Sequence, residues 1–487
     1  MKIVIVGGVA GGASAAARLR RLDEKAEIII LERGGYISFA NCGLPYYIGG
    51  EIQRKENLLL QTPQSFNARF NIDVRINNEV LAVNRAEKTV SVMNHATGQT
   101  YTESYDRLIL SMGAKPFVPD IGGKGSRRIF TLRNVPDTLM IKEFIANEGA
   151  KTALVMGGGY IGVEIAENLV SAGLKVTLAE LSDQVIAPID FDMACDVHNY
   201  MRHSGIDLRL KTKVSHVEDK GEYLEAEVGG DKIKVDMLIV AVGVSPESDI
   251  AQKAGLAVTS RGCIITNNQM LTNDESIYAV GDAVETTNFV TDEKGYIPLA
   301  GPANKQGRIA ADNICGIKSE YKNTQGSAIL KLFDMTVAST GINEKTAKAL
   351  GLDYEKSFTY SASHATYYPG ATQLGIKLIF SKADGRVLGA QVIGFEGVDK
   401  RCDVLATAIR AKMTVSDLTE LELCYAPPFS SAKDPVNMAG YVAENIQNGL
   451  TKIFHWHDLN ELMKNPNNVF LDVRTEYEHR IMKMDGF

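Results

Sequence analysis

Two segments of the chain share one order of a short apolar strand, a glycine turn and a helix. The first begins with KIVIV (residues 2–6) and continues as GGVAGGASAAARLRRL; the second is KTALVMGGGYIGVEIAENLVSAGLKVTLAE (residues 151–180). In such a unit the helix N-terminus presents free N–H groups and a positive dipole end to a pyrophosphate. The repeat predicts an α/β fold with two Rossmann-like dinucleotide-binding domains.

The first unit has Gly7, Val9 and Gly12 in the glycine frame, with Val9 where a second glycine usually stands. Gly7 is expected to allow the tight turn, and Gly12 lets the helix pack on the strand. The next strand, AEIIILE, ends at Glu32, twenty residues after Gly12. A carboxylate at this place can accept ribose hydroxyl groups, so Glu32 is a predicted cofactor contact.

The second unit carries a complete frame of Gly157, Gly159 and Gly162, and Glu180 closes its second strand. The negative charge of Glu180 would repel a 2′-phosphate, so the pattern favours NADH over NADPH. NADPH stays open because neighbouring loops can compensate for one charge.

Three further segments belong to the same two domains. Two of them contain an acid, then a strand, then a glycine: YDRLILSMGAKP (105–116) and DMLIVAVGVSPESD (236–249). The third, TNDESIYAVGDAVE (272–285), places an acid where it can bind a polyol chain. The predicted cofactor contacts from these regions and the helix beyond are Gly113, Gly243, Asp282 and Ala303. Two dinucleotide units in one chain indicate a bound FAD and a passing NAD(P)H.

Composition narrows the class of protein. The chain has 487 residues, enough for about three domains at roughly 150 residues each. A net charge of −7 argues against nucleic acid as a partner, and no apolar run is long enough for a membrane span. Six scattered cysteines suggest neither a metal site nor a disulfide scaffold, so we expect a cytoplasmic protein.

With these motifs in this order, residues 1–445 resemble the flavoprotein disulfide reductases that bind two dinucleotides. The resemblance implies an FAD domain split into residues 1–118 and 250–325, with an NAD(P)H domain at 119–249 between the two parts. It also implies an α+β dimerisation domain at 326–445, containing strands GIKLIF and VLGAQVIG and the helix VDKRCDVLATAIRAKM. The expected assembly is therefore a homodimer.

Cys42 stands in SFANCGLPYY (38–47), and the next cysteine, Cys195, lies in the other nucleotide domain. One sulfur cannot close an internal disulfide; it must cycle through a sulfenic acid or a mixed disulfide. The stretch resembles the single-cysteine branch of the family: NADH oxidases, NADH peroxidases and coenzyme A-disulfide reductases. A position at a helix start is expected to lower the thiol pKa. The alternative is a packed, inert cysteine.

Oxidases and peroxidases of this branch typically carry a histidine in the first glycine loop, where this chain has Ala10. SFANC, HATYYPGA (364–371) and YAPPFSSAKDPVN (425–437) instead resemble coenzyme A-disulfide reductases. That resemblance implies catalytic roles for Tyr367 and Tyr425, with Tyr425 supplied by the partner subunit. The alternative for Tyr425 is a packed aromatic. It also implies that coenzyme A is a substrate or bound ligand. The residues proposed to bind it are Ser14, Arg18, Arg21, Ser38, Asn41, Arg69, Lys305 and Lys433.

The composition changes after the dimerisation domain. Residues 446–453 read as a linker, and 454–487 resemble part of a rhodanese, a sulfur-transfer α/β domain, chiefly through VFLDVRTEYEH. A rhodanese needs about 100 residues and a catalytic cysteine, so we expect residues to be missing between His479 and Arg480. The alternative is a truncated linker.

Together these patterns predict an enzyme that uses FAD and NAD(P)H to reduce a coenzyme A disulfide, a coenzyme A persulfide or a polysulfide through Cys42. Two alternatives stay open. One is an NADH oxidase or peroxidase of the same fold. The other is a sulfur carrier or redox sensor that does not turn over.

Overall fold

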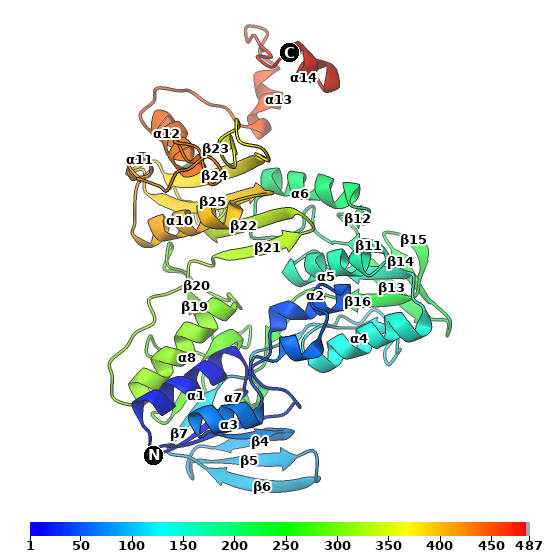
Figure 1. Cartoon of the computed structure of the whole chain (residues 1–487), viewed down its shortest axis with the longest axis vertical. Helices are drawn as coiled ribbons and strands as arrows, with labels where there is room; N and C mark the ends of the chain where they lie inside the picture. Colours follow the sequence, from blue (N-terminus) through cyan, green and yellow to red (C-terminus); the bar gives the residue numbers. More distant parts are fainter. Residues whose placement is uncertain (484–487) are drawn as a thin grey trace.

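The computed structural model describes residues 1–483 and arranges the chain around three large sheets (Figure 1). The first is parallel, in the order β18-β7-β1-β2-β3, and helices α1 (Ala10–Leu22) and α8 (Ala300–Ile314) lie side by side against it. Its strands are β1 (Lys2–Val6), β2 (Glu27–Glu32), β3 (Asp73–Ile76), β7 (Arg107–Leu110) and β18 (Ile277–Ala279). Because β18 rejoins the sheet from far along the chain, the first nucleotide fold is built from two separated segments.

The second sheet, in the order β12-β11-β10-β16-β9, repeats this architecture and is also parallel. Its strands are β9 (Ile129–Phe130), β10 (Thr152–Met156), β11 (Lys175–Ala179), β12 (Asp207–Arg209) and β16 (Met237–Val240). Its helices are α4 (Val135–Glu148), α5 (Tyr160–Ser171) and α6 (Phe191–His203). The predicted pair of Rossmann-like folds is confirmed.

Smaller elements flank these two sheets. An antiparallel pair, β8 (Ala114–Pro116) with β17 (Val244–Pro246), joins the two nucleotide folds. Two three-stranded sheets are formed by β4 (Asn78–Asn84), β5 (Thr89–Asn94) and β6 (Gln99–Ser104), and by β13 (Val214–Asp219), β14 (Leu224–Val228) and β15 (Asp231–Val235).

Steric contacts require glycine at fixed positions in the two glycine turns. Gly7 has φ +96°, and a Cβ built there would lie 2.2 Å from the Ser111 carbonyl oxygen. A Cβ on Gly12 would lie 2.0 Å from the Gly7 carbonyl oxygen, and one on Gly162 would lie 1.9 Å from that of Gly157. Only glycine lets each helix start this close to the strand before it.

The third sheet is antiparallel, in the order β21-β22-β25-β24-β23, and helix α10 packs on it. Its strands are β21 (Ala328–Leu332), β22 (Met335–Gly341), β23 (Tyr354–Ala362), β24 (Gln373–Ser381) and β25 (Val387–Gly394). Its helices are α10 (Val398–Arg410), α11 (Val415–Thr419) and α12 (Pro435–Gln447). This is the expected α+β domain, with the predicted strands and helix in place.

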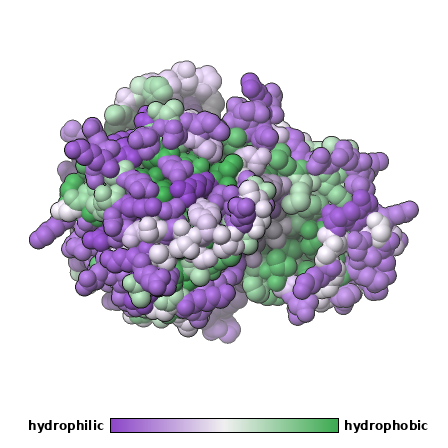
Figure 2. All heavy atoms as spheres, turned by 90° about the horizontal axis from the view of Figure 1, so that it is seen from below, coloured by the Kyte–Doolittle hydropathy of each residue, from purple (hydrophilic) through white to green (hydrophobic). Residues whose placement is uncertain are grey.

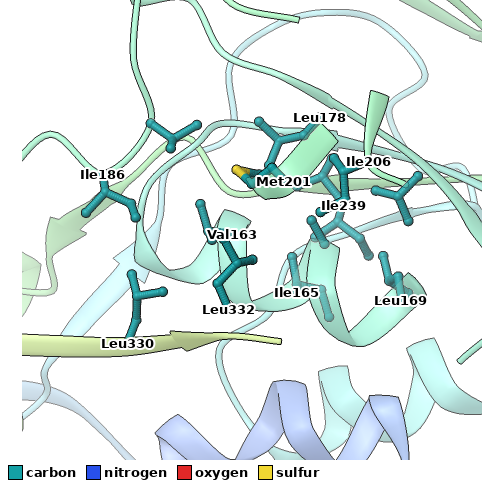
Figure 3. Packing of buried hydrophobic residues seen from close by; sticks show 14 of the residues in the cluster. Val163, Ile165, Leu169, Leu178, Ile186, Met201, Ile206, Ile239, Leu330 and Leu332 are labelled. Atoms are coloured by element: carbon teal, nitrogen blue, oxygen red, sulfur yellow. The ribbon is translucent and has the colours of Figure 1, made fainter. Parts of the chain in front are cut away.

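One apolar core joins parts of all three units. It contains Leu44 of helix α2 (Leu44–Gly49), Val163 and Leu169 of α5, and Leu330 and Leu332 of β21. Figure 3 shows side chains of the second sheet, α5 and β21 meeting in this cluster. The helix that follows Cys42 is therefore packed against the second nucleotide fold.

A buried ion cluster joins the start of α6 to the third sheet. Lys377 of β24 is fully buried, and its Nζ lies 3.0 Å from Asp190 Oδ2, 2.9 Å from Asp192 Oδ2 and 2.9 Å from Glu344 Oε2. Lys348 reaches the same glutamate from the exposed side, at 2.8 Å. The lysine charge is thus matched by carboxylates from both units.

The C-terminal segment carries short helices, α13 (Leu459–Leu462) and α14 (Glu476–Ile481), and no strand within residues 454–483. Val469 and Val473 are 90% and 87% exposed, because the VFLDV stretch has no neighbouring strand to pair with. The rhodanese resemblance therefore stays a prediction. His479 and Arg480 are consecutive within α14, and residues 484–487 of the rhodanese-like segment lie outside the described part.

The surface gives no sign of a membrane-crossing helix. Across residues 1–483, no helix combines the length and the apolar character that a span requires. Figure 2 shows one face of the molecule, where hydrophilic residues predominate and hydrophobic residues lie in patches between them.

We expect Lys377→Ala to lower the free energy of unfolding by about 3–5 kcal/mol, because it removes the lysine that pairs with the buried Asp190 and the half-buried Asp192. Trp456, the single tryptophan, lies 6.2 Å from the Phe191 ring at the start of α6, so its fluorescence in a denaturant titration reports on this junction. Lys348→Ala is the matched control and should cost less than about 1 kcal/mol. Equal losses in the two variants would contradict the role given to Lys377.

Candidate active site

A cleft of about 1960 Å³ runs between the two glycine turns. A pocket for one small molecule occupies roughly 300–1000 Å³, so this cleft has room for more than one ligand. Gly7 and Gly157 line it, and so does Cys42. The two nucleotide folds and the cysteine thus meet in one cavity.

The two predicted ribose-binding carboxylates have matching environments. Glu32 Oε2 accepts a hydrogen bond from the Gly8 N–H at 3.0 Å, and Glu180 Oε2 accepts one from the Gly158 N–H at 2.6 Å. The other oxygen of each accepts from a backbone N–H two residues later, at 2.8 Å and 2.7 Å. Each carboxylate is held at the end of its strand beside the glycine turn, and both line the cleft.

The cleft walls fit dinucleotides. A Cβ added at Gly159, Gly113 or Gly243 would meet no atom within 4 Å, so the backbone borders open space at these three positions. Asp282 and Ala303 also line the cleft. Gly12 and Gly162 do not line it; their close backbone contacts place them in helix packing. The Gly7 side, with Glu32, Gly113, Asp282 and Ala303, could hold FAD. The Gly157 side, with Gly159, Glu180 and Gly243, could hold NAD(P)H.

Cys42 lies in a single 3-10 turn, η1 (Asn41–Gly43), that leads directly into α2. Part of the residue reaches solvent, but burial in the cleft raises the pKa of its thiol, and the nearby carboxyl groups of Glu164 and Asp282 raise it further. The prediction of a lowered pKa is therefore wrong. The helix start is only a short turn, and its dipole does not offset the effect of burial and of the two carboxyl groups on the thiol.

The sequence patterns missed further cleft residues, among them Tyr160, Glu164, Asp399 and Cys402. Burial, followed by the charge of Glu167, raises the pKa of Glu164 to about 7. Burial raises the pKa of the Cys402 thiol to about 12, so this second cysteine stays a packed thiol. The position of Glu164, one turn into the helix after the second glycine frame, could have indicated its proximity to the cofactors.

The proposed coenzyme A residues fall into two groups. Ser14, Ser38 and Asn41 line the cleft, and the Ser14 hydroxyl donates a hydrogen bond to Asn304 at 2.7 Å. The basic residues do not line it. Arg18 pairs with Asp312 at 2.7 Å, whereas the guanidinium groups of Arg21 and Arg69 lie 5.8 Å and 5.1 Å from the centre of the Phe70 ring. Lys305 and Lys433 are exposed.

Tyr367 and Tyr425 form a pair on the third domain. Their hydroxyl oxygens are 2.7 Å apart, and the residues are 73% and 48% exposed. The hydrogen bond to Tyr425 raises the pKa of Tyr367, which keeps that phenol protonated. Neither residue lines the cleft that holds Cys42 of the same chain.

Two dinucleotide folds, a cysteine between them and an α+β domain define a flavin- and nicotinamide-dependent oxidoreductase. The chain belongs to the pyridine nucleotide-disulphide oxidoreductase family: the family model matches residues 1–307, and the dimerisation domain of the same family matches residues 327–435. The enzyme uses FAD and NAD(P)H, as this family does.

Three similar proteins narrow the comparison. A coenzyme A disulfide reductase of Staphylococcus haemolyticus is 39% identical over 446 residues, which cover 91% of this chain and 100% of the relative. A crystal structure of reduced Bacillus anthracis CoADR-RHD has a TM-score of 0.97 and 52% identity, covering 100% of this chain and 87% of that one. An NAD-dependent persulfide reductase from A. fulgidus has a TM-score of 0.90 and 40% identity, covering 93% and 84%.

We predict that Glu180→Ala will narrow the preference for NADH over NADPH by about tenfold in kcat/KM, the ratio that ~1.4 kcal/mol produces. The physical reason is the loss of a carboxylate that would face the 2′-phosphate. Steady-state kinetics with both nucleotides measure the ratio. Asp183→Ala, which removes a nearby exposed acid outside the cleft lining, should leave it unchanged. An unchanged ratio in Glu180→Ala would show that another group reads the ribose.

Proposed function

We propose that the protein reduces a coenzyme A disulfide or a coenzyme A persulfide with NAD(P)H, using Cys42 as its only redox sulfur. The observation that carries the proposal is the position of Cys42: it lines the same cleft as both glycine turns, while Cys402, the other cysteine there, has a thiol pKa of about 12. The names of the similar proteins support coenzyme A and persulfide substrates alike.

The chemistry at Cys42 is thiol–disulfide exchange. The thiolate attacks one sulfur of the substrate, so that a Cys42–sulfur bond forms, the substrate S–S bond breaks and one thiolate leaves. Bound FAD supplies the capacity to pass two electrons from NAD(P)H to the new mixed disulfide. Overall, one disulfide, one NAD(P)H and one proton give two thiols and NAD(P)⁺.

The leaving thiolate needs a proton, and we assign this step to Tyr367 and Tyr425 of the partner subunit. Their 2.7 Å contact allows one phenol to donate while the other stabilises it. The pair is exposed on the domain that matches the family's dimerisation model. A homodimer would bring the pair of one subunit to the cleft of the other.

The substrate needs positive charge for its phosphates. Arg21 and Arg69 both approach the Phe70 ring, and neither forms an ion pair within the described residues, so they supply a pair of positive charges near the start of the chain. Arg18 is less suitable because Asp312 already neutralises it. We therefore assign phosphate binding to Arg21 and Arg69 in preference to Arg18. We assign binding of the part of the substrate near the Cys42 sulfur to Ser14, Ser38 and Asn41.

Oxygen or peroxide reduction is the competing function. Ala10, at the start of α1, supplies no acid or base beside the first glycine turn. This favours a disulfide or persulfide over peroxide as the oxidant. Fast NADH consumption that depends on oxygen alone would favour the oxidase, and no turnover with any acceptor would favour a redox sensor.

We predict that Cys42→Ser will retain FAD and still accept hydride from NADH, but will lose reduction of coenzyme A disulfide and persulfide. Serine cannot form the mixed disulfide on which the reaction depends. The measurement is steady-state NADH oxidation with each substrate, beside flavin absorbance of the purified protein. Cys195→Ser, at a half-buried thiol outside the cleft, should keep turnover within about twofold of the parent. If Cys42→Ser oxidised NADH at the parental rate with both substrates, Cys42 would have only a packing role.

A hybrid dimer tests whether the tyrosines act across subunits. One chain carries Cys42→Ser, and the other carries Tyr367→Phe with Tyr425→Phe. If the tyrosines serve the partner's cleft, one of the two sites in the hybrid combines an intact Cys42 with intact tyrosines, and about half of parental activity returns. If they serve their own cleft, both sites stay defective and the hybrid is no more active than its parents. Light scattering establishes that the hybrid is a dimer.

A further inference from the structure

A second cavity, of about 240 Å³, lies where α2, α5 and the turn between β21 and β22 meet. Glu51, Lys331 and Asp334 line it and are exposed, so the cavity opens to solvent. Tyr46 and Glu167 also line it. These last two residues belong to the helices that carry groups of the catalytic cleft.

Glu167 is the unusual group in this cavity. It is only 4% exposed, and its Oε2 has no hydrogen-bond partner in the described structure. Burial raises the pKa of the carboxyl, and the charges of Glu51 and Asp334 act in the same direction; a hydrogen bond from the Phe333 backbone and the charge of Lys331 oppose them. A buried, unpaired carboxylate is unfavourable, so this group readily holds a proton.

Glu164 and Tyr46 are the titratable groups close enough to both Glu167 and Cys42 to interact with them electrostatically. Glu164 precedes Glu167 by three residues on α5, so the two carboxyl groups share one helix face. Glu164 lines the cleft beside Cys42, and its Oε1 lies 3.5 Å from the Tyr46 hydroxyl. Tyr46 stands four residues after the cysteine, on the helix that continues from its turn.

The other titratable groups around this chain of residues are few. Asp282 of the first nucleotide fold also faces Cys42. The charge of Glu164 raises the pKa of Tyr160 as well, although burial raises it more. Of the two carboxyl groups whose charges act on Cys42, Glu164 has a pKa that is raised, chiefly by burial, to about 7, where it can both give and take a proton.

We infer that Glu164, with Tyr46 and Glu167, exchanges the proton of Cys42 with solvent through the second cavity. This inference rests on the proposed function and gives that reaction its proton path. When Cys42 is activated, its S–H bond breaks and an O–H bond forms on Glu164, with no change in oxidation state. When two thiols are formed, a proton moves inward along the same groups, and solvent replaces it at Glu167.

Such a path has a purpose in the assembled enzyme. Ligands in the large cleft and the partner subunit's tyrosines would cover the sulfur from one side, whereas the second cavity reaches solvent between α2, α5 and the β21–β22 turn. A proton can then reach the sulfur while both ligands stay in place. The groups act through one another, so Glu167 is a positioning and relay residue and does not contact substrate.

The first test separates charge from proton transfer. In the holoenzyme, Glu164→Gln removes a negative charge beside Cys42, so the pKa of the thiol falls and its alkylation by iodoacetamide at neutral pH becomes faster. Turnover of coenzyme A disulfide should nevertheless fall by about 100-fold, because the proton acceptor is lost. Mass spectrometry of the Cys42 peptide as a function of pH gives the alkylation rates. A variant in which alkylation and turnover both fall, or in which neither changes, would overturn the inference.

The second test addresses the outer part of the path. Glu167→Gln should lower kcat by about tenfold with KM unchanged, and raise the solvent isotope effect on kcat. Imidazole, as a mobile proton carrier, should restore part of the rate, and Glu167→Asp should retain more of it than Glu167→Gln. Glu143→Gln, at an exposed site on α4, is the control. Parental kcat and isotope effect in Glu167→Gln would overturn the path through the second cavity.

The alkylation measurement also keeps the two proposals distinguishable. If the parent protein reduces neither coenzyme A disulfide nor persulfide, the proposed function fails. The effect of Glu164→Gln on the pH dependence of Cys42 alkylation needs neither substrate. A raised or unchanged thiol pKa in that variant would reject the link between Glu164 and Cys42, whatever the substrate.

Discussion

The contact between α2 and α5 determines where the reactive sulfur lies. A Cβ on Gly49 of α2 would come within 2.3 Å of the Asn168 side-chain oxygen on α5, so the two helices touch at the backbone of α2. Leu44 and Ile48 are buried in the same core as Val163 and Leu169. Because this packing crosses from one nucleotide fold to the other, Cys42 is held at the boundary between the two folds and not within either one.

The same contact explains why the thiol resists ionisation. It places Glu164 beside Cys42, and Asp282 approaches from the first nucleotide fold. Burial is the largest cause of the raised thiol pKa, and the two carboxyl groups add to it, so a short helix turn cannot compensate. The thiolate must therefore form when a nearby base accepts the proton and ligands occupy the cleft. A cysteine with a lowered pKa, in contrast, is ionised before any ligand binds.

The fold could be predicted from the sequence because its constraints are local. Gly7 and Gly157 need positive φ, and Glu32 and Glu180 stand at fixed distances from the turns, so one glycine pattern defines each nucleotide fold. The environment of Cys42 could not be predicted in this way, because Glu164 reaches it only through the packing of two distant segments. The ion pair of Arg18 could not be predicted for a similar reason: its partner, Asp312, is far along the chain. The predicted roles of the other site residues await their tests.

The buried Lys377 cluster has a consequence for how ligands reach the cleft. Moving the second nucleotide fold away from the third sheet would separate Lys377 from Asp190 and Asp192 and leave charges in a region that water does not reach. Hinged closure of these two units is therefore disfavoured. The part of the cleft that these two units line therefore keeps its shape. Nucleotide exchange on the Gly157 side must depend on side chains and loops at the rim, so its rate should respond to changes there far more than to changes in either sheet.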